Sequence, residues 1–140
     1  MSGIETKYKK VIASGKRKAA IAKAIIKSGN GKITFNGKLY STLHLFDKLK
    51  LEEPIRIAEK ILGKIEFDAQ INVKGGGEKG QIDAARIALA KGIVNFSNSE
   101  EVKDAFLEYD RTLLVADVRR KEARKPGDSR ARAKRQTSYR

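Results

Sequence analysis

The strongest structural signal in the sequence is the strict alternation of apolar and polar residues at positions 65–74, IEFDAQINVK. Every second residue from Ile65 to Val73 is apolar, and each residue between them is polar or charged. Because successive side chains of a strand point to opposite faces, this pattern predicts a strand that is buried on one side only. The sheet that contains it should therefore be packed on one face and solvated on the other.

Further strands are predicted upstream. Residues 32–36 place Ile33 and Phe35 on one side and follow SGNG, which favours a tight turn, so we expect a hairpin with the preceding segment. That segment, residues 16–27, is ambiguous, because its Ala and Lys favour a helix whereas the downstream turn favours a strand partner. We interpret it as a strand, and residues 8–14 as another.

Helical periodicity predicts the cover for the apolar face. In a helix over residues 81–95, Ile82, Ala85, Leu89, Ile93 and Phe96 fall within about 80° of one another on a 3.6-residue wheel. This apolar stripe is wide enough to pack on a sheet.

Two shorter helical patterns flank the predicted strand. Residues 52–63 predict a helix with Pro54 in its first turn and its end at Gly63, preceded by a separate short helix within residues 41–51. Another helix is expected from about Ser99, where Asn98 or Ser99 can cap the first turn. Residues 113–115, LLV, are the last expected core contribution.

The charge of the chain indicates a polyanionic partner. Lys and Arg number 31 against 17 Asp and Glu, a formal net charge of +14. Residues 119–140 hold ten of these bases and two of the acids, and their apolar content is too low to offset conformational entropy. We therefore predict a globular domain at residues 1–118 and an extended basic tail at 119–140. A merely solvated tail is the alternative, but a basic body accompanies it, which favours nucleic acid.

Other classes of protein are disfavoured. The chain has no cysteine, no run of about 18 apolar residues and no secretory leader pattern at its start, so we expect a cytoplasmic protein without disulfides, a metal centre or a membrane partner. His44 is the only histidine, and neither a Ser-His-Asp nor a Cys-His set of nucleophile and base can be assembled. We predict that the chain is not an enzyme and takes no cofactor.

A glycine-rich motif, GGGEKG, occupies residues 75–80. It contains a literal G-x-G-x-x-G between a predicted strand and a predicted helix, but Glu100 follows the helix with no parallel strand to carry it, which argues against a dinucleotide site. A Walker loop fails because Gln81 follows Gly80. Two interpretations stay open: a phosphate site at a helix N-terminus, or a turn that needs glycine for positive φ.

The basic and glycine-rich segments together define a predicted RNA surface. Charges beside a turn or on an extended tail can pair with phosphates without burial, and such contacts hold RNA without reading its sequence. Tyr139 near the chain end can stack on a base or ribose. The predicted RNA-binding residues are Lys9, Lys10, Lys16, Arg17, Lys18, Gly75, Gly76, Gly77, Lys79, Arg119, Arg120, Lys121, Arg124, Lys125, Arg130 and Arg132.

Four segments resemble a known family. GGGEKGQIDAARIALAKGI (75–93), SGKRKAAIAKA (14–24), GNGKITFNGK (29–38) and the closing SYR are similar to the ninth protein of the small ribosomal subunit. LLVADVRRKEARKP (113–126) and RARAKRQTSYR (130–140) resemble its archaeal and eukaryotic branch, and the short N-terminus its archaeal members. Related sequences tend to have glycines after the proline, where this chain reads GDSRAR and places Asp128 in a basic path.

The resemblance implies a fold and partners. It implies an α/β (α+β) fold with a four-stranded sheet, helices on one face and a left-handed βαβ crossover. It further implies a place in the head of the small subunit, bound to ribosomal RNA and beside other head proteins. The tail would contact the anticodon stem-loop of peptidyl-site tRNA through Lys134, Arg135, Ser138, Tyr139 and Arg140. Composition alone also permits a free-standing chromatin-like or duplex-binding protein.

Overall fold

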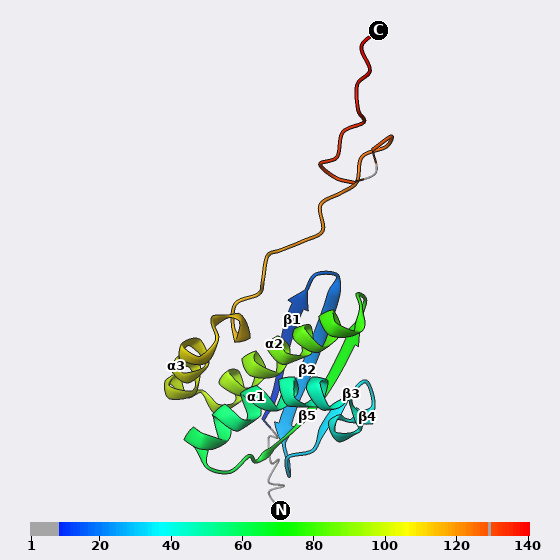
Figure 1. The fold of residues 1–140 in the computed structure, drawn as a ribbon. Coiled ribbons are helices and arrows are strands. Elements are labelled where there is room, and N and C mark those ends of the chain that lie inside the picture. Colours follow the sequence, from blue (N-terminus) through cyan, green and yellow to red (C-terminus); the bar gives the residue numbers. More distant parts are fainter. Residues whose placement is uncertain (1–8, 129) are drawn as a thin grey trace, which may run out of the picture.

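The amphipathic segments fold into one sheet with helices on one face, as the computed structural model of residues 9–128 and 130–140 shows (Figure 1). The sheet order is β1-β2-β5-β3-β4, and all neighbours are antiparallel except the parallel pair β3 and β5. This confirms the predicted mixed α and β fold. The strands are β1 (Lys10–Arg17), β2 (Ala20–Ser28), β3 (Ile33–Phe35), β4 (Lys38–Leu39) and β5 (Phe67–Lys74). The helices are α1 (Leu45–Leu62), α2 (Glu78–Ser97) and α3 (Glu100–Tyr109), with short 3-10 turns at Tyr40–Thr42 and Arg111–Leu113.

The sheet has five strands where four were expected. The additional strand, β4, is only two residues long and pairs with β3 after a turn in which Asn36 and Gly37 have φ of 47° and 82°. A strand of this length cannot display a period of two, so the sequence pattern carried no sign of it.

The predicted hairpin between β2 and β3 is wrong, because β5 lies between them. The Asp68 carboxylate accepts hydrogen bonds from the backbone N–H groups of Asn30 and Lys32, each at 2.9 Å, and so fixes the connection beside β5. The SGNG turn thus carries the chain across the end of β5. β5 is therefore the central strand of the sheet, which proximity in sequence could not reveal. The handedness of the β3-α1-β5 crossover stays a prediction.

The half-buried character predicted for β5 is confirmed. Phe67, Ala69, Ile71 and Val73 are buried, whereas the residues from Gln70 to Lys74 that alternate with them are exposed. The strand begins at Phe67, two residues later than the alternation suggests.

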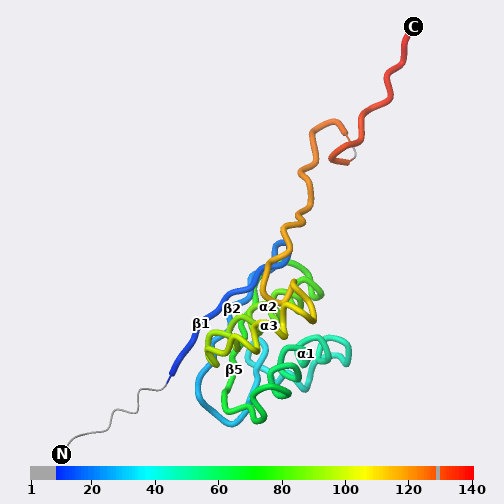
Figure 2. The backbone as a smooth tube through the Cα atoms, turned by 90° about the vertical axis from the view of Figure 1, so that its left-hand side faces the viewer, coloured from blue at the N-terminus to red at the C-terminus, as the bar shows by residue number. Residues whose placement is uncertain are grey.

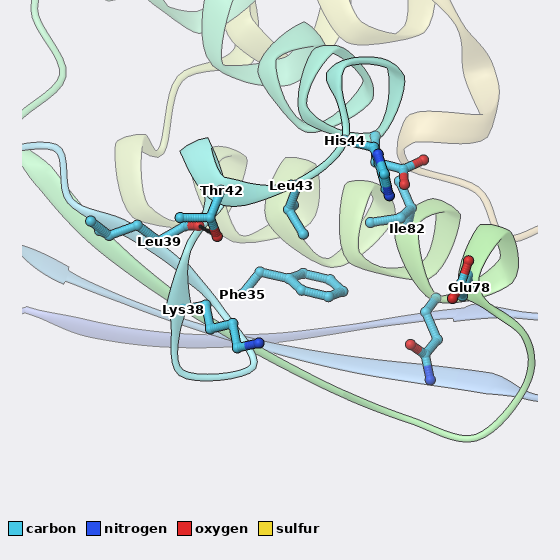
Figure 3. Close-up of a pocket in the computed structure, with 10 residues that line it drawn as sticks. Phe35, Lys38, Leu39, Thr42, Leu43, His44, Glu78 and Ile82 are labelled. Atoms are coloured by element: carbon cyan, nitrogen blue, oxygen red, sulfur yellow. Dashed lines mark hydrogen bonds between the residues drawn. The ribbon is translucent and has the colours of Figure 1, made fainter.

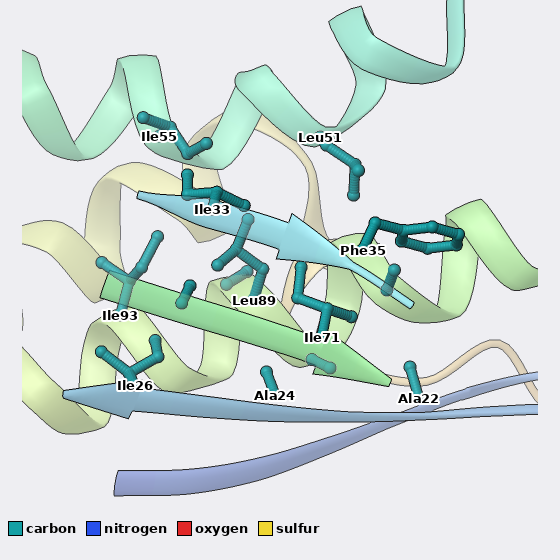
Figure 4. Close-up of a cluster of buried hydrophobic side chains, with 14 of the residues drawn as sticks. Ala22, Ala24, Ile26, Ile33, Phe35, Leu51, Ile55, Ile71, Leu89 and Ile93 are labelled. Atoms are coloured by element: carbon teal, nitrogen blue, oxygen red, sulfur yellow. The ribbon is translucent and has the colours of Figure 1, made fainter. Parts of the chain in front are cut away.

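Helix α2 covers the apolar face, as its stripe predicts. Ile82, Ala85, Leu89 and Ile93 are buried, and Phe96 packs at the edge of the core. Figure 4 shows Leu89 and Ile93 among the buried side chains of the sheet. The alanines of β2 that point toward α2 are buried. Gly15 of β1 and Gly92 of α2 let the sheet and the helix approach each other closely. A Cβ atom at Gly15 would lie 2.3 Å from the Ala84 carbonyl oxygen, so no larger residue fits there.

Residues 45–62 form one helix, and the prediction of two helices is wrong. Pro54 lies in the interior of α1 although it cannot donate the hydrogen bond of that turn. Leu51, Pro54, Ile55 and Ala58 are buried together on the core side, and this burial outweighs the missing bond. The end of the helix at Gly63, with φ of 80°, agrees with the prediction.

The predicted side-chain cap of α3 is absent. Ser99 occupies the N-cap position without a side-chain capping bond, and Asn98 instead ends α2 with φ of 51°. Glu100 and Glu101 lie in the first turn, where they compensate the positive end of the helix dipole.

The core ends at Leu113, which is fully buried, whereas Leu114 packs at its edge and Val115 is 44% exposed, contrary to prediction. From residue 114 onward the described chain contains neither helix nor strand. It runs away from the domain at the end that carries the β1–β2 turn (Figures 1 and 2). The division at residue 118 into a folding unit and a tail stays a prediction. Among the described residues, no helix is both long and apolar enough to cross a membrane.

Candidate nucleic-acid interface

Three basic or glycine-rich segments meet in an open groove of about 900 Å³ beside the start of the tail. They are the β1–β2 turn, the glycine-rich turn before α2, and the first basic residues after Asp117. The sequence separates these segments by up to about a hundred residues, and the fold brings them together. The groove is lined by Lys16, Arg17, Lys18, Ala19, Ile21, Gly76, Gly77, Arg119, Arg120 and Lys121.

The two turns of the groove pack directly on each other. Gly75 and Gly76 have φ of 77° and 66°, and a Cβ atom on them would lie 2.8 Å from the Ala19 carbonyl oxygen and 2.9 Å from the Ala20 nitrogen, respectively. The Gln81 side chain donates a hydrogen bond of 3.1 Å to the Gly75 carbonyl and holds the turn. The glycines are therefore required by backbone geometry, which is the second interpretation of the motif.

The same turn places the positive end of α2 at the groove. Gly77 is the N-cap residue of this 20-residue helix and lines the groove together with Gly76. Free backbone N–H groups and the helix dipole favour an anion at such a position. A phosphate contact by Gly75, Gly76 and Gly77 stays a prediction.

Arg17 differs from its neighbours because carboxylates already surround it. Its Nη1 lies 2.9 Å from Asp117 Oδ2 and its Nε lies 4.0 Å from Asp83 Oδ2. Its side chain is only 16% exposed. Arg17 therefore links β1 to α2 through Asp83 and to the start of the tail through Asp117. Lys16 and Lys18 beside it are exposed.

Asp117 organises the base of the tail. The Arg119 side chain donates to its Oδ2 at 2.8 Å and the Arg119 backbone N–H to its Oδ1 at 2.9 Å. These bonds, together with the charges of Arg119 and Arg17, lower the pKa of Asp117 to about 2. Sequence reasoning missed this residue, although a single acid two residues before a basic run is a visible signal.

Three other predicted RNA-binding lysines lie outside the groove. Lys79 pairs with the buried Asp47 at 2.8 Å, and this hydrogen bond raises the pKa of Lys79. Lys9 and Lys10 lie at the opposite end of β1, where Lys9 contacts the Phe96 carbonyl and lies over the Phe96 ring. The groove thus gathers only part of the predicted set.

The tail presents the remaining predicted residues on an extended, hooked path. Arg132 Nε lies 2.9 Å from Glu122 Oε2, and the Arg135 backbone N–H donates to Asp128 Oδ1 at 3.2 Å. Asp128, the departure noted in the sequence, therefore serves a contact within the tail. The other predicted tail side chains are exposed: Arg124, Lys125, Arg130, Lys134, Ser138, Tyr139 and Arg140.

A second hollow, of about 590 Å³, lies between α1, α2 and the β3–β4 hairpin (Figure 3). Phe35, Leu43 and Ile82 form its apolar part, and His44 lies at its rim. Among the described residues, no hydroxyl or carboxylate is hydrogen-bonded to His44.

A small α/β domain with a cationic groove and a projecting basic tail is typical of proteins that bind nucleic acid. Residues 15–140 match the family described as ribosomal protein S9/S16. The chain belongs to this family.

Relatives agree along nearly the whole chain. "Small ribosomal subunit protein uS9" of Thermoplasma volcanium is 49% identical over 134 residues, covering 93% of this chain and 98% of the relative. The protein of the same name from Methanococcus vannielii is 50% identical, covering 90% and 95%, and that of Pyrobaculum aerophilum is 43% identical, covering 93% and 91%. These archaeal sources confirm the archaeal-type resemblance seen in the sequence.

Proposed function

We propose that this protein is a structural constituent of the small ribosomal subunit in the cytoplasm, and that it has no catalytic role. Its groove binds ribosomal RNA, and its tail contacts the anticodon stem-loop of peptidyl-site tRNA. Membership of the ribosomal S9/S16 family supports the place in the subunit. The relatives' name specifies no RNA contact, and the support for these contacts comes from exposed residues of this chain.

Exposed cations converge on one groove, and the RNA proposal rests on this observation. Lys16, Lys18, Arg120 and Lys121 line it, and all four are exposed and form no ion pair among the described residues. Gly76 and Gly77 add the positive end of a long helix at the same place. Such a cluster suits a phosphate backbone, because each neutralised phosphate releases condensed counterions.

The shape of the tail supports a second and more distant contact. Its last 16 residues, if fully extended, span about 50 Å at about 3.3 Å per residue. Tyr139, near the end, is 93% exposed, and Arg140 follows it. A thin basic segment that ends in an aromatic residue and a guanidinium can reach an RNA stem far from the docked domain.

Sedimentation tests the place in the subunit. In an extract at moderate salt, the tagged full-length protein should migrate with small subunits and should leave them only when the subunits are dissociated. Migration with DNA or with free RNA instead would favour the chromatin-like or duplex-binding alternative.

A terminal deletion tests the tRNA contact. Small subunits assembled with protein lacking Arg140 should bind peptidyl-site tRNA more weakly than wild-type subunits, because the deletion removes a charged group that pairs with the tRNA backbone. Subunits carrying Gln136→Ala provide the matched control in the same tail. Equal tRNA affinity for all three would remove the tail contact from the proposal but not the RNA-binding groove.

A further inference from the structure

One face of the sheet is covered by no helix of the described chain. The helices lie on one side of the strands (Figures 1 and 2), and the residues of β1, β2 and β5 that point toward them are buried. The side chains that alternate with these point to the other side. We define the open face as Lys10, Ile12, Ser14, Lys16, Ile21, Lys23, Ile25, Lys27, Asp68, Gln70, Asn72 and Lys74.

Five lysines are distributed over this open face in register. Lys10 lies directly opposite Lys27, and Lys23 lies between Ser14 and Asn72. Lys16 and Lys74 lie on either side of Ile21. The one acid of the open face, Asp68, lies directly opposite Lys27 on the side away from Lys10. It accepts two backbone hydrogen bonds from the neighbouring loop, and no ion pair joins it to Lys27 among the described residues.

The ion pairs of the described chain lie away from the open face. Within residues 9–128 and 130–140, the ion pairs lie on the helices, around Asp117 and in the tail, and none reaches a lysine of the open face. Like charges directly opposite each other, such as Lys10 and Lys27, destabilise a strand pair. This charge arrangement favours a state in which an external anion lies against the sheet.

We propose that the open face is a second RNA-binding surface, which grips the backbone of folded ribosomal RNA. This open-face site rests on the proposed function and adds a second RNA-binding surface to it. Lys16 and Ile21 belong to both the open face and the groove, so RNA can pass from one to the other without a break. Three strands about 4.8 Å apart and about eight residues long give a platform of about 10 by 25 Å.

The side chains of the open face favour backbone contact over base recognition. None of its residues is aromatic, so it lacks the stacking platform on which proteins hold unpaired bases. Ser14, Gln70 and Asn72 can donate to phosphates or 2′-hydroxyls, and Ile12 and Ile21, both about half exposed, provide flat contact area. A structured RNA with a continuous backbone fits this surface better than a single strand.

Charge removal on the open face tests the proposal. The variant Lys23→Gln with Lys27→Gln changes two exposed residues that belong to neither groove nor tail. The control, Lys60→Gln with Lys64→Gln, removes the same charge from two exposed lysines at the end of α1 and just after it, neither of which forms an ion pair among the described residues. Binding of each full-length protein to a transcript of archaeal small-subunit ribosomal RNA is measured as a function of KCl concentration.

The open-face variant should show a log-log salt slope shallower by about 1.4–1.8, from about 0.7–0.9 for each phosphate that is no longer neutralised, while the control keeps a slope near wild type. Its urea midpoint should stay close to that of wild type, because the substitution relieves the repulsion between Lys10 and Lys27 but also removes the attraction between Lys27 and Asp68. Equal slopes for the two variants, with wild type binding normally, would overturn the open-face site alone. Failure of wild type to bind would overturn the proposed RNA function as well.

Acetylation of lysines separates RNA from a protein partner. In the complex with the transcript alone, Lys23 and Lys27 should be protected relative to the free protein, as read by mass spectrometry, while Lys60 stays reactive. Protection that arises only in complete subunits, and not with the transcript, would mean that another protein covers the sheet, and the proposal would be wrong.

Discussion

Arg17 and Asp117 join the two ends of the candidate interface, with Arg17 Nη1 2.9 Å from Asp117 Oδ2. One residue ends β1, and the other lies a hundred positions later, two residues before the basic tail. The contact fixes where the tail leaves the domain, beside the β1–β2 turn. It also uses the least exposed cation of the groove, so the neighbouring cations stay exposed.

The titration of Asp117 should depend mainly on Arg119. A carboxyl-carbon NMR titration of the full-length protein should give Asp117 a pKa of about 2, and Arg119→Ala should move it toward the usual value of about 3.9. Arg120→Ala is the control, because Arg120 donates to backbone carbonyls and not to this carboxylate. An unchanged pKa in Arg119→Ala would contradict the assigned cause.

The same pKa predicts how stability depends on pH. Since the folded-state pKa lies below that of the unfolded chain, the ionised Asp117 stabilises the fold above about pH 4, and this contribution disappears as the pH falls toward 2. Asp117→Asn should therefore lower stability at pH 7 and have little effect near pH 2, as measured by urea unfolding. Asp104→Asn, at an exposed position of α3, should change neither.

Two glycines should respond to alanine in opposite directions. Gly15→Ala places a Cβ atom 2.3 Å from the Ala84 carbonyl oxygen and 2.6 Å from the Ala88 nitrogen, so the free energy of unfolding should fall by about 3 kcal/mol. Gly80→Ala, inside α2, meets its nearest atom at 3.7 Å and should raise it by about 0.5–1 kcal/mol. Urea unfolding of both proteins measures the difference, and equal midpoints would count against the close packing of β1 on α2.

The end of the core can be located by truncating side chains. Leu113 is fully buried, so Leu113→Ala should cost about 2–5 kcal/mol of unfolding free energy. Val118 is 87% exposed, and Val118→Ala should stay within about 0.5 kcal/mol of wild type. Similar losses at both positions in urea unfolding would extend the core into the segment assigned to the tail.

Groove lysines and paired lysines should differ in RNA binding. Lys18→Gln removes an exposed groove cation and should make the log-log salt slope shallower by about 0.7–0.9. Lys79→Gln removes a lysine held by Asp47 and should change the slope much less. Filter binding to the ribosomal RNA transcript measures both, and a larger effect at Lys79 would mean that its pair with Asp47 opens on RNA.

Removal of residues 119–140 should leave the domain folded. The described tail adds no helix or strand, and the buried core ends before it, so the far-UV circular dichroism of the helices and cooperative unfolding should persist. RNA affinity should fall, with a shallower salt slope, because the segment carries ten bases. Loss of cooperative unfolding would instead assign the tail to the folding unit.

The sequence by itself determined the elements that are long enough to show several repeats of their hydrophobic period. The alternation before Lys74 predicted the half-buried strand β5, and the stripe from Ile82 predicted the packed face of α2. These features follow from the side chains of each segment, because apolar side chains favour a core and polar side chains favour water. They required no knowledge of which segments are neighbours.

Only the tertiary structure decided which segments meet. The insertion of β5 between β2 and β3, the continuation of α1 through Pro54 and the pairing of Arg17 with Asp117 each depend on contacts between distant residues. Lysines identical in the sequence become a groove cation at Lys18, an ion-pair partner at Lys79 or an open-face residue at Lys23. The physical reason is that burial and charge pairing are properties of a residue's neighbours in space, and a period in the sequence reports only the direction of a side chain.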